Sequence, residues 1–379
     1  SASGSGNDGK INYFLSGNYA DQDGIVKNTG FERYSVRANV NAEITDKLKI
    51  GLNTFATRSS TQNDLNSFNR FQGSLITKSL TWDPTTPIFD QDGNYNRFSE
   101  KSLASLNQNP IEDINTTNIQ GINDRFNANF NLSYDFLEGF NYTLLAGATT
   151  INNATETYRL DEPLNDVGFS SAKNTLHQVS NILTWSKVFN EKHDLKVTGV
   201  YEFSGIENRN NNYSGNDLSL PLGFYQGELS AARNFNNGYS KSSIESVMGR
   251  AEYSLNNTFY LTGTVRSDSS SKFRDGNRTG VFPSISAKYN FQNILGDDAK
   301  VLTNFNIRAG WGQVGNQNIA AYTTYPSVAI GFVTGLGNVQ YAYDGSQVSP
   351  GSVPDSYGNP DLTWETTTQT NIGLDASFF

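Results

Sequence analysis

Cysteine is absent from this sequence of 379 residues, and histidine occurs only twice, as His177 and His193. The lack of cysteine excludes disulfide bonds, cysteine-based zinc sites and cysteine nucleophiles. No apolar run approaches the roughly 18 residues that a transmembrane helix needs, and the mean hydropathy is −0.52. A membrane-spanning β-barrel stays possible, because its strands carry apolar residues only at alternate positions.

Charge is also scarce, since charged residues make up 17% of the chain and the formal net charge is −9. A negative chain without a basic stripe is not suited to binding nucleic acid. Aromatic residues, by contrast, reach 12%, and there are 34 glycines. This composition is too polar for a helical membrane protein and too aromatic for a disordered one.

Alternation of apolar and polar residues is the dominant pattern along the chain. In residues 125–136, for example, Phe126 and Phe130 share one face, whereas Asn127 and Asn129 share the other. About twelve such strands are expected, most of roughly 9 to 13 residues, the length that crosses a bilayer when tilted. They start near Ile11, Tyr34, Leu48, Phe126, Tyr142, Val179, Leu195, Val247, Phe259, Val281, Phe305 and Thr370.

The predicted connections alternate between short and long. Short polar turns are expected at 44–47, 137–139, 190–193 and 256–258, and long loops at about 59–121, 151–172, 207–241 and 314–366. This alternation is typical of outer-membrane barrels, whose turns face the periplasm and whose loops face the exterior. Aromatic residues at strand ends fit a girdle at the membrane interface: Phe136, Phe140, Phe189, Phe259, Tyr289 and Phe291. We therefore predict an all-β fold, a transmembrane antiparallel β-barrel.

No catalytic residue, cofactor or metal site is predicted. His193 falls in a short turn, on the rim opposite the long loops, so the two histidines are not expected to share a site. The sequence "DQDG" occurs at 21–24 and at 90–93, and each copy begins like a calcium loop. Because the remaining ligands are missing, tight turns are favoured over calcium sites.

Four stretches, taken in order, resemble segments of the SusC/RagA-like TonB-dependent outer-membrane transporters of Bacteroidota. They are residues 13–53, "RTGVFPSISAKYNF" at 278–291, "NIRAGWGQVGNQNIAAYTTY" at 306–325 and "GNPDLTWETTTQTNIGLDASFF" at 358–379. The resemblance implies a barrel of about 22 strands with a plug domain inside it. It also implies energy supply by TonB and a SusD-like surface lipoprotein that acts as a lid, with transporter and lipoprotein pairs forming a dimer. We expect residues 1–379 to be a partial barrel, without plug domain or signal peptide.

The function implied is active import of oligosaccharides or oligopeptides across the outer membrane of a Gram-negative bacterium, in contact with outer-membrane lipids. The alternative is a complete twelve-stranded barrel that acts as a passive channel or as an adhesive or structural surface protein, since an even strand count permits closure. Neither function involves catalysis.

Binding is therefore assigned to the loops and the lumen. Aromatic loop residues are candidates for contact with substrate or lid, although packing among the loops is favoured for any one of them: Trp82, Tyr95, Phe98, Tyr225, Tyr322, Tyr325, Tyr341 and Tyr343. The alternation also places four arginines on the polar, lumen-facing side of their strands: Arg37, Arg250, Arg266 and Arg308.

Overall fold

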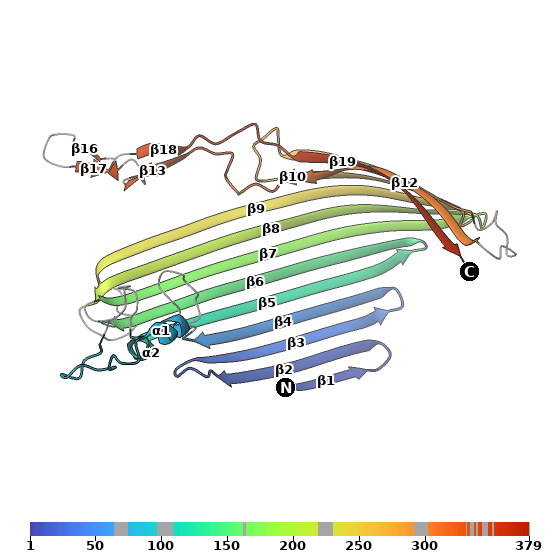
Figure 1. Cartoon of the computed structure of the whole chain (residues 1–379). Coiled ribbons are helices and arrows are strands. Elements are labelled where there is room, and N and C mark those ends of the chain that lie inside the picture. The colour runs from blue at the N-terminus through green and yellow to red at the C-terminus, as the bar shows by residue number, and fades with distance from the viewer. Residues whose placement is uncertain are drawn as a thin grey trace.

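One continuous antiparallel sheet of thirteen strands dominates the computed structural model (Figure 1). Each strand pairs with the next along the chain, except that β19 lies directly beside β12. The strands are β1 Ala2–Asn7, β2 Ile11–Asp23, β3 Gly30–Thr45, β4 Leu48–Gln62, β5 Thr117–Leu137, β6 Phe140–Asp161, β7 Leu164–Phe189, β8 His193–Leu218, β9 Ser230–Leu255, β10 Phe259–Ser270, β11 Thr279–Asn290, β12 Leu302–Asn316 and β19 Glu365–Phe378. The structure describes residues 1–63, 75–96, 109–161, 164–218, 230–291, 302–330, 332–333, 337–338, 340–342, 348–350 and 352–378.

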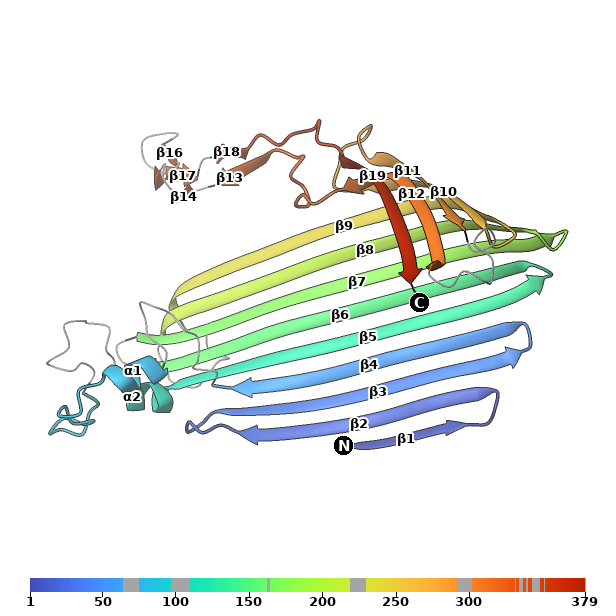
Figure 2. The same cartoon turned by 45° about the vertical axis from the view of Figure 1, so that its right-hand side comes forward.

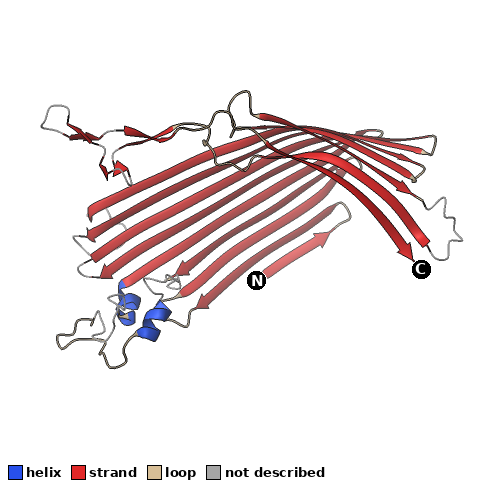
Figure 3. Ribbon diagram, turned by 45° about the horizontal axis from the view of Figure 1, so that its top comes forward, coloured by secondary structure: helices blue, strands red, loops and turns tan. Residues whose placement is uncertain are grey.

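The sheet is strongly curved and open. Figures 2 and 3 show that β10, β11, β12 and β19 bend away from the wall formed by β1 to β9, which gives the sheet a hollow side. The two edge strands, β1 and β19, do not pair with each other among the described residues. The described strands thus form a barrel segment, and the closed twelve-stranded barrel considered above is not what they form.

Short elements lie outside this sheet. Helices α1 Leu75–Thr81 and α2 Pro110–Thr116 follow β4, and three small hairpins lie between β12 and β19. Their strands are β13 Ser327–Ile330 with β18 Ser352–Ser356, β14 Phe332–Val333 with β15 Gly337–Asn338, and β16 Gln340–Ala342 with β17 Val348–Pro350. In the described part of the chain, neither helix has the length or the apolar character to span a bilayer.

All twelve strands predicted from alternation are present, and one more, β1, was missed. Its sequence, "ASGSGN", has no apolar residue with which to alternate apart from Ala2. It forms because it can pair over its whole length with β2, from Ala2 opposite Gly17 to Asn7 opposite Asn12. Backbone pairing of this kind leaves no trace in hydrophobic periodicity.

Tight turns join β3 to β4, β5 to β6, β7 to β8 and β9 to β10 at one rim of the sheet, as predicted; we call this edge the turn rim. In the β7–β8 turn Asn190 and Glu191 have φ values of 49° and 59°, and in the β9–β10 turn Asn256 and Asn257 have 51° and 53°. Positive φ at both central positions is the type I′ geometry, which matches the right-handed twist of the flanking strands.

The opposite edge, the loop rim, differs from the prediction at two places, because most of segments 151–172 and 207–241 is strand. Strands β6 to β9 continue through them and reach 22 to 26 residues. The alternation stops there because both faces are polar: Lys173 lies opposite Arg209 on one face, and Asn174 opposite Asn208 on the other. The strands nevertheless continue, because ladder hydrogen bonds need no apolar face.

The described parts of the other two predicted loops, 59–121 and 314–366, lie mainly outside the sheet, between β4 and β5 and between β12 and β19. They contain the two helices and the three small hairpins. The longest excursions of the chain are therefore at the loop rim, on the side opposite the tight turns.

Aromatic rings form a row near the turn rim on β5, β6 and β7. Successive ring centroids lie 6.1 Å apart for Tyr134 and Phe136, 5.7 Å for Phe136 and Phe140, 6.2 Å for Phe140 and Trp185, and 6.3 Å for Trp185 and Phe189. A second group joins Tyr289 to Phe291 at 4.6 Å and Phe291 to Phe305 at 5.2 Å. These rows are the arrangement expected of an interfacial girdle.

Candidate functional site

Register and alternation give the sheet one polar face and one apolar face. Asn39, Asn53 and Asn129, for example, align in one row of the polar face. Large side chains of the apolar face are more than half exposed: Val247, Val265, Val281, Ile285, Ile372 and Leu374. Polar side chains of the other face are buried: Ser180, Ser246, Asp268, Ser270 and Asn306. Because side chains crowd together on the hollow side of a curved sheet, the polar face is the inner face.

An ion-paired network around Arg266 crosses this inner face. The guanidinium Nε donates to both carboxylate oxygens of Asp268, at 2.8 and 3.0 Å. Its Nη2 donates to Ser246 Oγ at 2.9 Å and lies 3.3 Å from Glu202 Oε1. The other oxygen of Glu202 accepts a hydrogen bond from Ser180 Oγ at 2.8 Å. One arginine thus connects side chains of β7, β8, β9 and β10.

The other three predicted arginines also lie on the inner face, but each has a simpler environment. Arg37 lies over the ring of Phe55, with its Cζ 5.5 Å from the centroid. Arg250 Nη2 lies 2.7 Å from Glu252 Oε1. The guanidinium of Arg308 lies 3.5 Å from Asp375 Oδ1, and both of these side chains are about half exposed or more.

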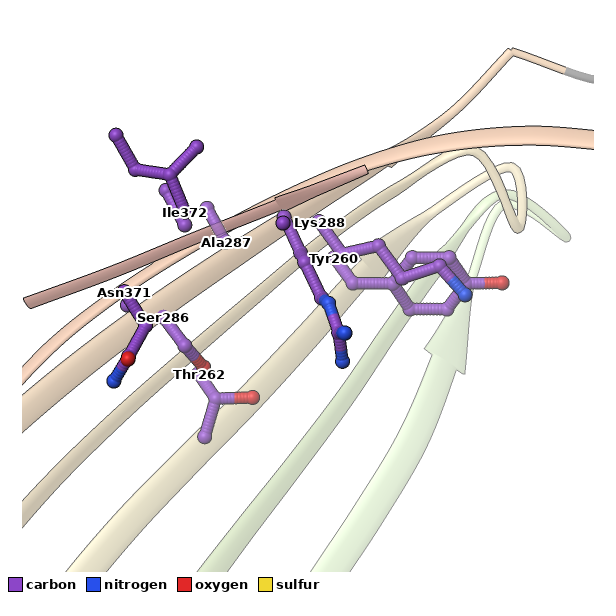
Figure 4. A pocket seen from close by; sticks show the side chains of 11 residues that line it. Tyr260, Thr262, Ser286, Ala287, Lys288, Asn371 and Ile372 are labelled. Atoms are coloured by element: carbon purple, nitrogen blue, oxygen red, sulfur yellow. The ribbon is translucent and has the colours of Figure 1, made fainter. Parts of the chain in front are cut away.

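A cavity of about 630 Å³ with a mixed polar and apolar lining lies against β10, β11, β12 and β19. Figure 4 shows Thr262, Ser286 and Asn371 on one side of these strands and Ile372 on the other. Lys288 lies over the ring of Tyr260, with its Nζ 5.4 Å from the centroid, and Arg308 contributes a second cation. The cavity therefore combines two cations, an aromatic ring, hydroxyl groups and an amide, which suits a polar or anionic ligand.

Glycine at position 373 makes room for Arg308, which lies directly opposite on β12. A Cβ atom added at Gly373 would lie 2.5 Å from Arg308 Nε. The absent side chain lets the side chain of Arg308 pass over position 373.

Three of the predicted loop aromatics pack among the loops, two against their own loop and one against a neighbouring loop. Trp82 Nε1 donates to the carbonyl oxygen of Thr86 at 3.3 Å. The ring of Tyr95 lies 4.9 Å from that of Phe89, and its hydroxyl accepts a hydrogen bond from Asn115 Nδ2 at 3.0 Å.

Tyr325 is the third, since Arg274 stacks on its ring at 3.7 Å. Tyr322 has a positive φ of 68° and a side chain that is 48% exposed. Tyr341 belongs to β16, where only the backbone is described. Phe98, Tyr225 and Tyr343 lie outside the described residues. Trp82, Tyr95 and Tyr325 thus pack among the loops, and contact of the predicted aromatics with substrate or lid stays a prediction.

A buried aromatic cluster at the loop rim was not predicted. Trp364 lies 5.6 Å from Phe273 and 5.4 Å from Phe282, centroid to centroid, and its Nε1 donates to the carbonyl oxygen of Arg278 at 2.8 Å. Phe273 is 1% exposed. The cluster anchors the start of β19 to the β10–β11 loop.

The histidines and the acidic turns do not come together. His177 stacks on Phe203 at 5.6 Å, and His193 Nδ1 lies 2.7 Å from Tyr253 Oη at the turn rim. The second "DQDG" is a tight turn, in which Asp90 Oδ1 accepts from the backbone N–H groups of Asp92 and Asn94. Within the described residues, no three acidic or histidine side chains gather into a possible metal site.

Comparison with known proteins identifies the family. A family model described as "TonB dependent receptor-like, beta-barrel" matches residues 61–379. The chain is 29% identical over 397 aligned positions to TonB-dependent receptor P3 of Formosa agariphila, covering 99% of this chain and 37% of that protein. It is 26% identical over 411 positions to TonB-dependent receptor SusC of Bacteroides thetaiotaomicron, covering 97% of this chain and 38% of that protein.

The fold is shared with solved structures. The RagAB peptide transporter matches with a TM-score of 0.78 at 22% identity, covering 100% of this chain and 42% of the other. The RagAB importer in its "open-open" state matches with a TM-score of 0.79. The chain spans well under half of the length of the relatives it matches. Its location is the outer membrane, and it belongs to the TonB-dependent receptor-like β-barrel family.

Proposed function

We propose that this chain forms wall and loops of an active importer that takes up oligosaccharides or oligopeptides through the outer membrane. TonB supplies the energy, and a SusD-like surface lipoprotein closes over the loop rim and delivers the substrate. Transport by such a protein is binding and conformational gating, without covalent chemistry. The turn rim faces the periplasm and the loop rim the exterior.

The observation that carries this proposal is the inner face. A sheet whose outer side exposes aliphatic residues and whose inner side carries asparagines, hydroxyl groups and ion pairs suits a wet passage through a membrane. The Arg266 network and the cavity at Lys288 and Arg308 supply fixed polar groups along that passage. Relatives described as a peptide transporter and as SusC support import over a structural role.

Deletion of the gene in its host tests the proposal. The mutant should fail to grow when oligosaccharides or oligopeptides of the right class are the only source of carbon or nitrogen. Its growth on the corresponding monomers should be unchanged. Growth on every polymer tested, at the rate of the parent strain, would contradict import.

A protonophore separates active import from the passive channel. Uptake of a labelled oligomer should stop when the proton-motive force collapses, because TonB-driven transport depends on it. Uptake that continues unchanged would support the channel instead. A strain that lacks the partner lipoprotein should lose uptake at low substrate concentration.

A further inference from the structure

The outer face of β7, β8 and β9 carries an apolar band that starts at the turn rim. Above the aromatic row at Trp185, its side chains include Leu183, Val179, Tyr201 and Val247, which are 37% to 58% exposed. In an outer-membrane barrel this band faces the hydrocarbon of the bilayer.

Three cations follow directly where the band ends. Lys173, Arg209 and Tyr239 align in one row of the outer face, and Lys241 lies one row nearer the turn rim, opposite Glu207. Lys173 lies twelve residues from Trp185 along β7. At about 3.3 Å per residue and a tilt of about 40°, this spacing is roughly 30 Å along the membrane normal. The cations thus lie at the level of the lipid headgroups, on the loop-rim side.

The charges in this cluster are not balanced within the protein. Arg209 Nη2 lies 2.6 Å from Glu207 Oε1, and its guanidinium also stacks on Tyr239 at 5.6 Å. Lys173 and Lys241 are exposed, and neither ammonium has an ion pair among the described residues. Two unpaired cations beside an ion pair are notable in a chain whose net charge is −9.

We propose that Lys173, Arg209 and Lys241 bind the phosphate groups of an anionic glycolipid in the outer leaflet. Lysine ammonium groups and a guanidinium are the donors that phosphate prefers. Basic residues at the edge of an apolar band are suited to anionic headgroups, whose acyl chains then lie along the band. The ring of Tyr239, 55% exposed, offers a flat surface to a headgroup sugar. The inference rests on the orientation proposed above, with the loop rim outside.

The test uses the intact receptor in nanodiscs of neutral phospholipid, with purified bisphosphorylated lipid A as the probe. Binding of lipid A is measured by native mass spectrometry for the parent protein and for the double variant Lys173→Gln/Lys241→Gln. The matched control is Lys187→Gln, since Lys187 lies on the same strand and the same face but at the turn rim. Each lysine removed should weaken binding roughly fivefold, and the control should bind like the parent.

Four outcomes would overturn the proposal. The first is that the double variant binds lipid A as tightly as the parent, with both equally heat-modifiable and therefore folded. The second is that dephosphorylated lipid A binds as well as the bisphosphorylated form, which would remove the role of phosphate. Loss of binding in Lys187→Gln alone would place the turn rim outside and so reverse the orientation. Inorganic phosphate at equal concentration should not displace the lipid, and displacement would identify a site for free phosphate.

Discussion

Arg266 is the side chain on which most inner-face contacts converge. It bonds to Asp268 and Ser246 and pairs with Glu202, and Asp268 and Ser246 are themselves buried. A buried carboxylate that loses its partner keeps the full cost of desolvation, so this network is more sensitive to truncation than an exposed pair.

Truncation of Arg266 should therefore destabilise the barrel. For Arg266→Ala we expect a loss of roughly 1–3 kcal/mol in the free energy of unfolding, because Asp268 and Glu202 both lose their cationic partner. Arg250→Ala is the matched control: it removes an inner-face arginine with one carboxylate partner, Glu252, and should cost less than about 1 kcal/mol. Urea titration of the receptor in detergent, followed by heat-modifiable migration, measures both. Equal losses of unfolding free energy in the two variants would show that the Arg266 network adds no stability beyond that of a single exposed ion pair.

The tight turns fix the register of long hairpins, and one of them carries an unfavourable residue. In the β7–β8 turn, Lys192 N–H donates to Phe189 O at 3.2 Å across Asn190 and Glu191. Glu191 has a φ of 59°, a conformation that glycine adopts more readily than any residue with a Cβ.

Glycine at this position should stabilise the hairpin. For Glu191→Gly we expect a gain of up to about 1 kcal/mol, since relief of the left-handed strain exceeds the entropy that glycine loses. The same change at Glu138, in the β5–β6 turn and without a positive φ, should destabilise by roughly 0.5–1 kcal/mol. The urea concentrations at which the two variants are half unfolded are compared with that of the parent. A fall in both variants would contradict the strain argument.

Much of the strand pattern could be predicted from alternation, because alternation reports what each face of a strand touches. It located the strands that contain Phe126 and Val179 and the turns between them, and it placed Arg266 and Arg308 on the inner face. It could not show that β7 continues to Leu164, since the alternation is interrupted at Lys173 and Asn174, where both faces are polar.

The contacts within the site could not be predicted in the same way. Glu202 and Arg266 meet because two hairpins place β8 and β10 on either side of β9, and they are 64 positions apart. The packing of Trp364 on Phe282 likewise joins segments that are far apart in sequence. Such pairs depend on the register of several strands at once, which local patterns do not contain.

The open sheet as a whole makes a prediction about this stretch of chain in isolation. A polypeptide limited to residues 1–379 should aggregate in detergent, because β1 and β19 both present unpaired backbone groups that a membrane cannot satisfy. Light scattering coupled to size-exclusion chromatography measures this, with the intact receptor as the control. A monodisperse, heat-modifiable monomer would instead favour a barrel that closes on its own.

The wall described here has an uneven height. Strand β9 has 26 residues and its neighbour β10 has 12, although the same turn joins the end of β9 to the start of β10. At about 3.3 Å per residue, the loop rim falls by roughly 45 Å along the strand direction between these neighbours. In the described sheet, β6 to β9 therefore extend much further toward the loop rim than β10 and β11 do. Figures 1 and 2 show the segment that carries β13 and β18 extending past the ends of β10 and β11, in the same direction as the long end of β9. Over this step the rim therefore consists of loop segments, which depend on packing such as that of Trp364 on Phe273 and not on ladder hydrogen bonds.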